Sequence, residues 1–436
     1  TSLSKEASKS KVAVSTRSPE DLKQVIKRFA ERAFSSSLSE EELAPYQQPS
    51  LVALKEGESF VEAAKIGLKA VLCSHRFLMA PGEHENQSYA RAGSLARTFW
   101  LSVPDQESLK ISQADKLAIK DVPAQVDHML KDPRSRRMIH SFCNQWLDLR
   151  SFDKIAPSLK LYPLYNDLLN HYLPLETEAY LDHLIRENLP IVRLIDSDFS
   201  FLNQRLAQHY GIPGIYGQNL RKVSFDPKVP RGGLLTMGSV LKVTADGFDT
   251  SPILRGAWIS KNIAGNTLSP PPEEVEVIEP EHGKDAATLR EQIEEHKKSQ
   301  ACYACHKSID PYGFALESFD ATGQWREQYR VKKAHKATFT YRRSGYFELT
   351  GAVNPSGEIA KEKFSDIFGL KKILLSNHKK IAYNFVKKFF EYANGYKPSL
   401  AQRLDLFAMI PDKPEECRIK DLITKTLVYS LGGQQK

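Results

Sequence analysis

The sequence has little of what membrane proteins and disulfide-stabilised domains need. No run of about 18 apolar residues is present, so we predict no transmembrane helix. Residues 1–5 lack the apolar core of a signal peptide, and we expect either a chain that is not exported or one whose signal peptide has been removed. The five cysteines are sparse and odd in number, which excludes a disulfide scaffold.

The chain also lacks a strong charge of one sign. Its 61 Lys and Arg residues against 53 Asp and Glu give a formal net charge of +8 over 436 residues. The strongest basic stretch, residues 332–343, includes Phe339 and Tyr341, a mixture also found in nucleic-acid sites. A solvated loop or strand edge is the simpler interpretation of one short stretch. We therefore expect no nucleic-acid partner.

Two of the cysteines form a motif with a specific chemistry. Cys302, Cys305 and His306 make the pattern C-x-x-C-H, in which two thiols attach a haem and the histidine ligates its iron. Cys and His are scarce in this chain, so the pattern is rarely met by chance. We predict one covalently bound haem c, attached through Cys302 and Cys305, with His306 as proximal ligand.

Two other uses of the motif stay open. A zinc site usually has four ligands, and a second cysteine pair is missing, although His282 and His296 lie upstream. A thioredoxin-like redox pair would be expected in a βαβ context, which the sequence does not show. Haem attachment takes place outside the cytoplasm, so the haem interpretation predicts a periplasmic or other extracytoplasmic location.

The sixth ligand of the iron would decide between electron transfer and binding of a small molecule. His296 is the first candidate, because it shares a predicted helix face with Leu289 and Ile293. Met237 is the second, since a thioether ligates iron in many cytochromes. Another residue, water or an open position is the remaining alternative. His296 and Met237 are also plausible as ordinary core residues.

Two further residues are predicted near the haem. The fork of Arg255 fits a haem propionate, or Arg255 forms an ordinary ion pair within the protein. The second ring nitrogen of His306 needs an acceptor. A backbone carbonyl of residues 309–311 is the simplest candidate, and the Asp310 carboxylate is the alternative.

Hydrophobic periodicity predicts a mainly α fold. We expect multi-helix domains, a loop-rich haem c segment and at most a small β-hairpin, over residues 337–352. Ser39 with Glu42 has the spacing of a capping box, and prolines including Pro174 are expected to break the helices of residues 86–215. Cys73 and Cys143 stand in apolar helical contexts and are expected to be buried.

Composition and pattern suggest five segments. They are a tail or linker at residues 1–17, an N-terminal helical domain at 18–85, a helical domain at 86–224, a haem c-binding domain at 225–335 and a C-terminal helical domain at 336–436.

The chain resembles a cytochrome family of planctomycete type, built from the 1595, 1592, 1588 and 1585 series of domains of unknown function. The resemblance to the first domain rests on residues 29–34 with Leu38 and Glu41, and that to the second on residues 96–100, 103–105, 129–134, 145–147 and 199–211. The third has the most specific motifs, and the last covers residues 346–432. The motifs of the third domain are at residues 231–235, 250–252, 255–258, 302–306 and 310–320.

The family resemblance carries no settled reaction. With the motif, it favours an exported monohaem c-type cytochrome in electron transfer, with a redox partner protein and possible membership of a larger assembly. One alternative is a haem enzyme, such as a peroxidase or an oxidoreductase acting on an organic substrate. Another is a structural or partner-binding protein in which the haem mainly stabilises the fold. The sequence alone leaves open whether the protein is an enzyme.

Overall fold

The computed structural model describes residues 18–34, 36–78, 87–113, 117–268, 289–298, 300–332 and 347–433. The predicted tail, the proline triplet at 270–272 and most of the basic stretch lie outside these residues. The chain divides into two units by its internal contacts. Unit 1 comprises residues 1–138 and 427–436, and unit 2 comprises residues 139–426.

Helices make up the described part of unit 1. They are α2 (Pro19–Phe34), α3 (Glu40–Lys55), α4 (Phe60–Leu72), α5 (His75–Leu78), α6 (Gln87–Trp100), α7 (Gln106–Gln113), η2 (Ile119–Asp121), α8 (Val122–Lys131) and η3 (Pro133–Ser135). Two helices belong to both units, α9 (Arg136–Trp146) and α19 (Ile419–Gly432).

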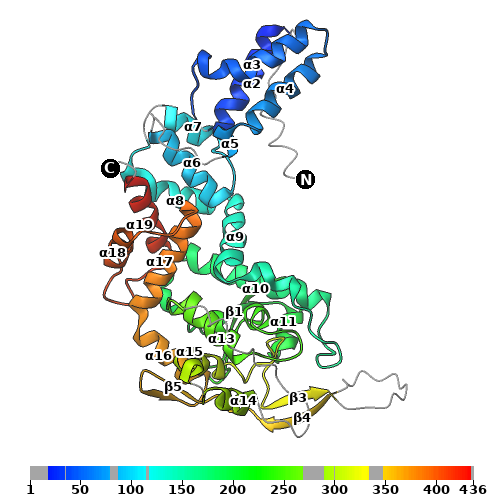
Figure 1. Cartoon of the computed structure of the whole chain (residues 1–436), viewed down its shortest axis with the longest axis vertical. Coiled ribbons are helices and arrows are strands. Elements are labelled where there is room, and N and C mark those ends of the chain that lie inside the picture. Colours follow the sequence, from blue (N-terminus) through cyan, green and yellow to red (C-terminus); the bar gives the residue numbers. More distant parts are fainter. Residues whose placement is uncertain are drawn as a thin grey trace, which may run out of the picture. The chain divides into compact units, whose positions relative to one another are not determined.

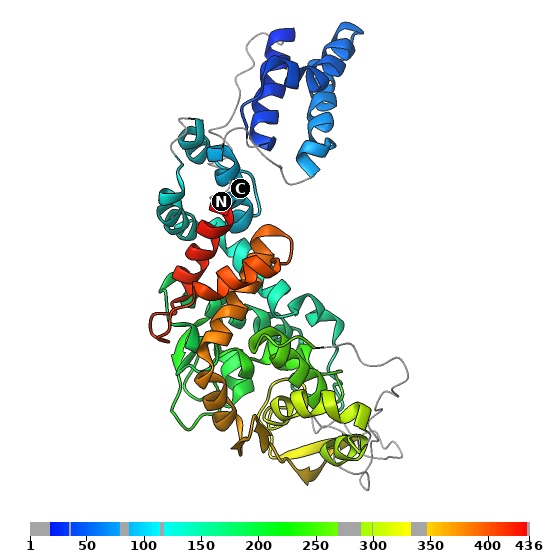
Figure 2. The same cartoon turned by 60° about the vertical axis from the view of Figure 1, so that its left-hand side comes forward.

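The first three helices of unit 1 pack against one another (Figures 1 and 2). Their shared core contains Leu22, Ile26 and Ala63, all fully buried. Helix α3 begins after Ser39, whose hydroxyl accepts from the backbone N–H of Glu42, while the Glu42 carboxylate accepts from the Ser39 N–H. This reciprocal cap is the predicted capping box, and it satisfies two N–H groups that a helix start would otherwise leave unpaired.

Unit 2 is also mainly helical, which confirms the predicted fold class. Its longer helices are α10 (Asp167–Arg186), α11 (Gln204–Tyr210), α12 (Gly238–Val243), α13 (Pro252–Trp258), α14 (Leu289–His296), α15 (Gln300–Phe314), α16 (Ile367–Ser376), α17 (His378–Asn394) and α18 (Leu400–Ala408). Short turns are η4 (Leu149–Lys154), η5 (Ile191–Leu194), η6 (Leu234–Thr236) and the π-helix η7 (Ile259–Ile263).

The strands of the described residues form small antiparallel pairs. β1 (Phe199–Leu202) pairs with β2 (Arg221–Ser224), β3 (Gln328–Lys332) with β4 (Phe347–Ala352), and β5 (Gly357–Ile359) with β6 (Glu362–Phe364). β4 occupies the second half of the predicted hairpin, and its partner is β3; residues 337–346 lie outside the described chain.

Two local expectations were wrong. Helix α10 continues through Pro174, which costs one backbone hydrogen bond but leaves a helix of 20 residues with buried side chains on both sides of the proline. Tertiary packing therefore outweighs the local break. Cys73, the C-cap residue of α4, is exposed, whereas Cys143 is fully buried, as predicted.

No helix within the described ranges combines the length and the apolar character that crossing a membrane requires.

Candidate haem-attachment site

The C-x-x-C-H motif lies inside a helix. α15 includes Cys302, Cys305 and His306, so the two cysteines are three positions apart and the histidine is four positions after the first. Residues at these spacings share one face of an α-helix. Cys305 is half-buried with a free thiol, and the side chain of Cys302 lies outside the described atoms. The motif thus lies within a single helix, at spacings that are compatible with one helix face.

His306 is oriented by a buried carboxylate on the next turn. Its Nδ1 lies 3.0 Å and 3.1 Å from the two carboxylate oxygens of Asp310. The Asp310 side chain is fully buried and that of His306 is 12% exposed. Nδ1–H donation to Asp310 leaves the lone pair on Nε2, the nitrogen that could then ligate a metal. The acceptor is therefore the carboxylate, not the backbone carbonyl that we expected first.

Burial and the neighbouring His306 act in opposite directions on the pKa of Asp310. Burial raises the pKa of Asp310, and the neighbouring His306 opposes that rise by its charge and its hydrogen bond. A carboxylate in such a place favours the imidazole orientation that donates to it. The result is a histidine whose ring direction and tautomer are fixed before any ligand binds.

His296 is close to His306. Its ring centroid lies 5.1 Å from that of His306, with an angle of 65° between the ring planes. His296 is the last residue of α14, whose one buried side chain among those described is Ile293. Burial and then the charge of His306 lower the pKa of His296, which favours the neutral imidazole that ligates metals. The structure thus brings these two predicted ligands together.

Met237 lies in a different environment. It is buried, precedes α12, and has backbone hydrogen bonds to η6 and to Leu241. Helix α12 packs on α10 and η4, whereas α15 packs on α13, η7 and β5. The next residue, Gly238, lies against Leu173 and Tyr210. These surroundings are those of a core methionine, the alternative that the sequence left open.

Two glycines let α13 and α15 meet backbone to backbone. A Cβ at Gly256 would lie 2.0 Å from the carbonyl oxygen of Ile309, and one at Gly313 would lie 1.8 Å from that of Pro252. Any larger residue would force the helices apart. The helix that carries the motif is thereby fixed on α13 from Pro252 to Gly256.

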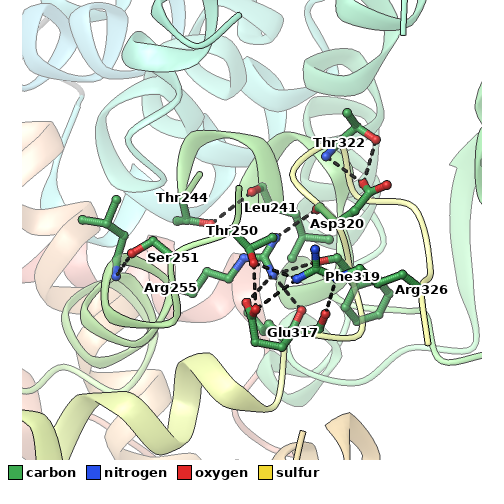
Figure 3. Close-up of polar contacts among 12 residues, drawn as sticks. Leu241, Thr244, Thr250, Ser251, Arg255, Glu317, Phe319, Asp320, Thr322 and Arg326 are labelled. Atoms are coloured by element: carbon green, nitrogen blue, oxygen red, sulfur yellow. Dashed lines mark hydrogen bonds and ion pairs between the residues drawn. The ribbon is translucent and has the colours of Figure 1, made fainter. Parts of the chain in front are cut away.

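Arg255, also on α13, continues this attachment beyond the end of α15 (Figure 3). It is fully buried and donates to the carbonyls of Leu316, Phe319 and Asp320 and to Glu317 Oε1, at 2.8 to 3.1 Å. Burial lowers the pKa of Arg255 to about 10, against the opposing charge of Glu317, so it stays protonated at neutral pH. Arg255 forms the buried ion pair that we weighed against a propionate contact.

Glu317 is shared by two arginines (Figure 3). Its Oε1 pairs with Arg255 at 3.1 Å, and its Oε2 pairs with Arg326 at 3.0 Å and accepts from the Thr250 hydroxyl at 2.7 Å. Asp320 closes the turn that follows, because its Oδ1 accepts from the backbone and hydroxyl of Thr322. Charged groups at this depth are stable only when they are paired and hydrogen-bonded.

Sequence reasoning offered an ion pair as one role of Arg255 but did not name its partners. Arg255 and its acceptors are more than 60 positions apart, so no local spacing predicts the contact. The available signal was the position of Arg255 and Glu317 in apolar stretches of the sequence, since charged residues are rarely buried unless they are paired.

The residues present fit a c-type haem. Two cysteines stand at the attachment spacing on one helix, and the histidine after them has its Nδ1 occupied by Asp310. His306 Nε2 would hold the iron, and His296, whose ring centroid lies 5.1 Å from that of His306, is the neighbouring imidazole that could serve as a second ligand. When bound, haem would supply reversible one-electron chemistry at its iron.

Three family models match the chain, in the order that the sequence resemblance predicts. Each of the three models is described as a protein of unknown function. Residues 21–81 match DUF1595 (PSD5), residues 87–212 match DUF1592 (PSD4), and residues 231–329 match DUF1588 (PSCyt3). The resemblance of residues 346–432 to the 1585 domain stays a prediction. No curated protein and no solved structure matches the chain. The chain belongs to the planctomycete cytochrome-type family that is built from this series of domains.

Proposed function

We propose that this chain is an exported c-type cytochrome with one haem bound through Cys302 and Cys305. The observation that carries the proposal is the C-x-x-C-H motif within α15, with the Nδ1 of its histidine 3.0 Å from the buried carboxylate of Asp310. Carboxylate acceptors of this kind fix the tautomer of a ligating histidine and raise its basicity. Membership of a cytochrome-type family supports the same assignment.

Electron transfer is the activity that we infer. His306 would ligate the iron from α15, and His296 would ligate it from α14, which excludes exogenous molecules from the second axial position. Such a site exchanges electrons with a redox partner protein and turns over no substrate. Because thiol attachment of haem is an extracytoplasmic process, the proposal places the mature protein in the periplasm or an equivalent compartment.

Covalent attachment is tested by producing the chain with a c-type maturation system. Intact mass should exceed that of the chain by one haem, and the colour should remain with the protein through acid–acetone extraction. Cys302→Ser and Cys305→Ser should each lose a thioether bond, whereas Cys73→Ser, at an exposed cysteine outside the motif, should not. Haem that extracts from the unmodified protein would contradict the proposal.

Axial ligation is tested by spectra of the oxidised and reduced protein with and without carbon monoxide. We expect a low-spin haem that does not bind carbon monoxide. His296→Ala should produce a high-spin, carbon monoxide-binding form, and Met237→Ala should not. His306→Ala should alter the spectrum and the reduction potential. A high-spin protein that binds carbon monoxide without any substitution would support a haem enzyme instead.

A further inference from the structure

Helix α18 carries large apolar side chains on the face that it turns to solvent. Leu400 is 67% exposed, Leu404 is 66% exposed and Phe407 is 47% exposed. Their spacings of four and three positions place them along one side of the helix. We call these three residues the α18 stripe. Single exposed leucines are ordinary on protein surfaces, but adjoining large apolar side chains form a patch that marks an interaction site.

The stripe is not what holds α18 in the fold. α18 packs on α17 (Figure 1), and this helix, which is described in full, has one buried side chain, Leu406. Leu406 follows Leu404 by two positions and therefore lies about 160° from it around the helix. A helix with apolar side chains on opposite sides is typical of one that is covered on both. The stripe is thus available to a partner outside the fold.

Lysines of α17 border the stripe. The Nζ of Lys379 lies 6.0 Å from the ring centroid of Phe407, and the Nζ of Lys387 lies 6.0 Å from that of Tyr383. The Tyr383 and Phe407 rings meet edge to face, with 5.5 Å between their centroids. Lys379 also pairs with Asp412. The side of the stripe that meets α17 therefore joins aromatic rings to cations.

Positive charge exceeds negative charge on this side. Residues 378–408 contain six Lys and Arg residues against two acids, Glu391 and Asp405. Glu391 lies 3.6 Å from the Nζ of Lys388. Asp405 lies about 160° around α18 from Arg403, on the other flank of the stripe. The two acids therefore leave most of the positive charge on the α17 side uncompensated.

Lys387 reports the sign of the local field. Burial and then the charge of Lys388 lower the pKa of Lys387, and Arg403 and Lys397 lower it further, with Glu391 opposing them. Cations that lower one another's pKa gain from a nearby anion. The partner that fits this surface has negative charge beside an apolar layer.

The size of the stripe favours a lipid surface over a protein. A helix of nine residues extends over about 13 Å. A stable protein interface usually takes about 20–30 residues from each side. A bilayer interface instead accepts a few apolar side chains, with Lys and Arg beside them at the level of the headgroups. Anionic phospholipids supply both acyl chains for the stripe and phosphates for the cations.

We propose that the α18 stripe docks this protein on an anionic phospholipid surface. Leu400, Leu404 and Phe407 enter the boundary between headgroups and acyl chains, while Lys387 and Arg403 contact the lipid phosphates. This function goes beyond the proposed haem function, because no residue of α18 belongs to the C-x-x-C-H motif or to α14.

Co-sedimentation of the haem-loaded protein with vesicles tests this proposal. Phosphatidylcholine vesicles that contain one-quarter phosphatidylglycerol are the anionic probe, and pure phosphatidylcholine vesicles are the neutral control. We expect binding to the anionic vesicles to be at least ~10-fold tighter at low salt and to weaken as salt is added, because each Lys or Arg near an anionic surface strengthens binding. Equal binding to both vesicles, or no binding to the anionic ones, would overturn the proposal.

Matched variants locate the binding on α18. Leu404→Gln and Arg403→Gln should each weaken binding to the anionic vesicles by ~5-fold or more. Leu159→Gln changes a leucine that is 65% exposed, and Arg150→Gln changes an exposed arginine of η4. Both control positions lie outside α17 and α18, and these variants should bind as the unmodified protein does. Vesicle binding that survives both α18 substitutions would contradict the assignment to the stripe.

Two further measurements separate this proposal from others. Each α18 variant should keep the haem spectrum and the urea midpoint of the unmodified protein, because the substituted side chains are exposed. Failure of lipid docking is therefore distinguishable from failure of the haem proposal. Sedimentation velocity without lipid should give the mass of one chain. A dimer that Leu404→Gln dissociates would show that a second copy covers the stripe, and would overturn the proposal.

Discussion

Replacing Gly313 by alanine should loosen the helix that carries the haem motif. A Cβ there would lie 1.8 Å from the carbonyl oxygen, 2.5 Å from the carbonyl carbon and 2.7 Å from the Cα of Pro252. All three are backbone atoms, so no side-chain rotation relieves the overlap. Helices α13 and α15 would have to separate by at least about 1.2 Å before the shortest contact reached 3.0 Å.

The expected cost follows from two opposing effects. Overpacking a close contact typically costs ~1–3 kcal/mol, and a contact between two backbones belongs at the upper end. Alanine stabilises a helix by ~1 kcal/mol relative to glycine, and this gain offsets part of the overpacking cost. The free energy of unfolding should therefore fall by about 2 kcal/mol or more, roughly a 30-fold change in the folding equilibrium.

Urea unfolding followed by circular dichroism measures this change as a lower midpoint. Gly432→Ala is the matched control, because that glycine is also helical and its Cβ would meet only Ile119 Cδ1, at 3.9 Å. The control should be neutral or slightly more stable. A Gly313→Ala variant with an unchanged midpoint would refute the direct backbone contact between α13 and α15.

Four further predictions concern the same unit. Asp310→Asn removes the charged acceptor of His306 Nδ1 and should raise the haem reduction potential, measured by spectroelectrochemical titration. An unchanged potential would show that the carboxylate does not affect His306 as an iron ligand. Glu317→Gln leaves Arg255 and Arg326 buried without their carboxylate and should cost ~3–5 kcal/mol of stability in urea, whereas Glu358→Gln should cost little. Burial raises the pKa of Glu176 from 4.5 to about 7, so between these pH values the folded state holds a proton that the unfolded state has lost. The free energy of unfolding should therefore fall by about 3 kcal/mol as the pH rises from 4.5 to 7. Glu176→Gln should abolish this pH dependence of stability. Ile293→Ala should weaken the docking of α14 and increase carbon monoxide binding, and a variant that stays low-spin would argue against His296 as the distal ligand.

The features that the sequence predicted best are local ones. The capping box at Ser39 needs only Glu42 three positions later. Amphipathic periodicity likewise depends on neighbouring turns, so the mainly α fold was predictable. These signals are contained within single elements of the structure.

The features that escaped prediction depend on distant contacts. Pro174 is accommodated because side chains before and after it in α10 are buried against other elements. The carboxylate partner of His306 was only the second choice, because an aspartate before Pro311 is more typical of a cap or a turn. The contacts of Gly256 and Gly313 with Ile309 and Pro252 join segments more than 50 residues apart. No local pattern encodes such pairings.

The two candidate axial histidines are held very differently, which bears on how the proposed haem would behave. His306 belongs to a helix that is locked onto α13 by Gly256 and Gly313, and the turns after it are braced by Arg255. His296 ends the eight-residue helix α14, which the described contacts anchor through Ile293 and through Arg290, whose guanidinium lies over the Phe314 ring at 3.9 Å. His306 is therefore the more firmly held of the two. If both histidines hold the proposed haem, we expect a change in ligand access or reduction potential to come from movement of α14, because moving one short helix disturbs far less packing than moving α15.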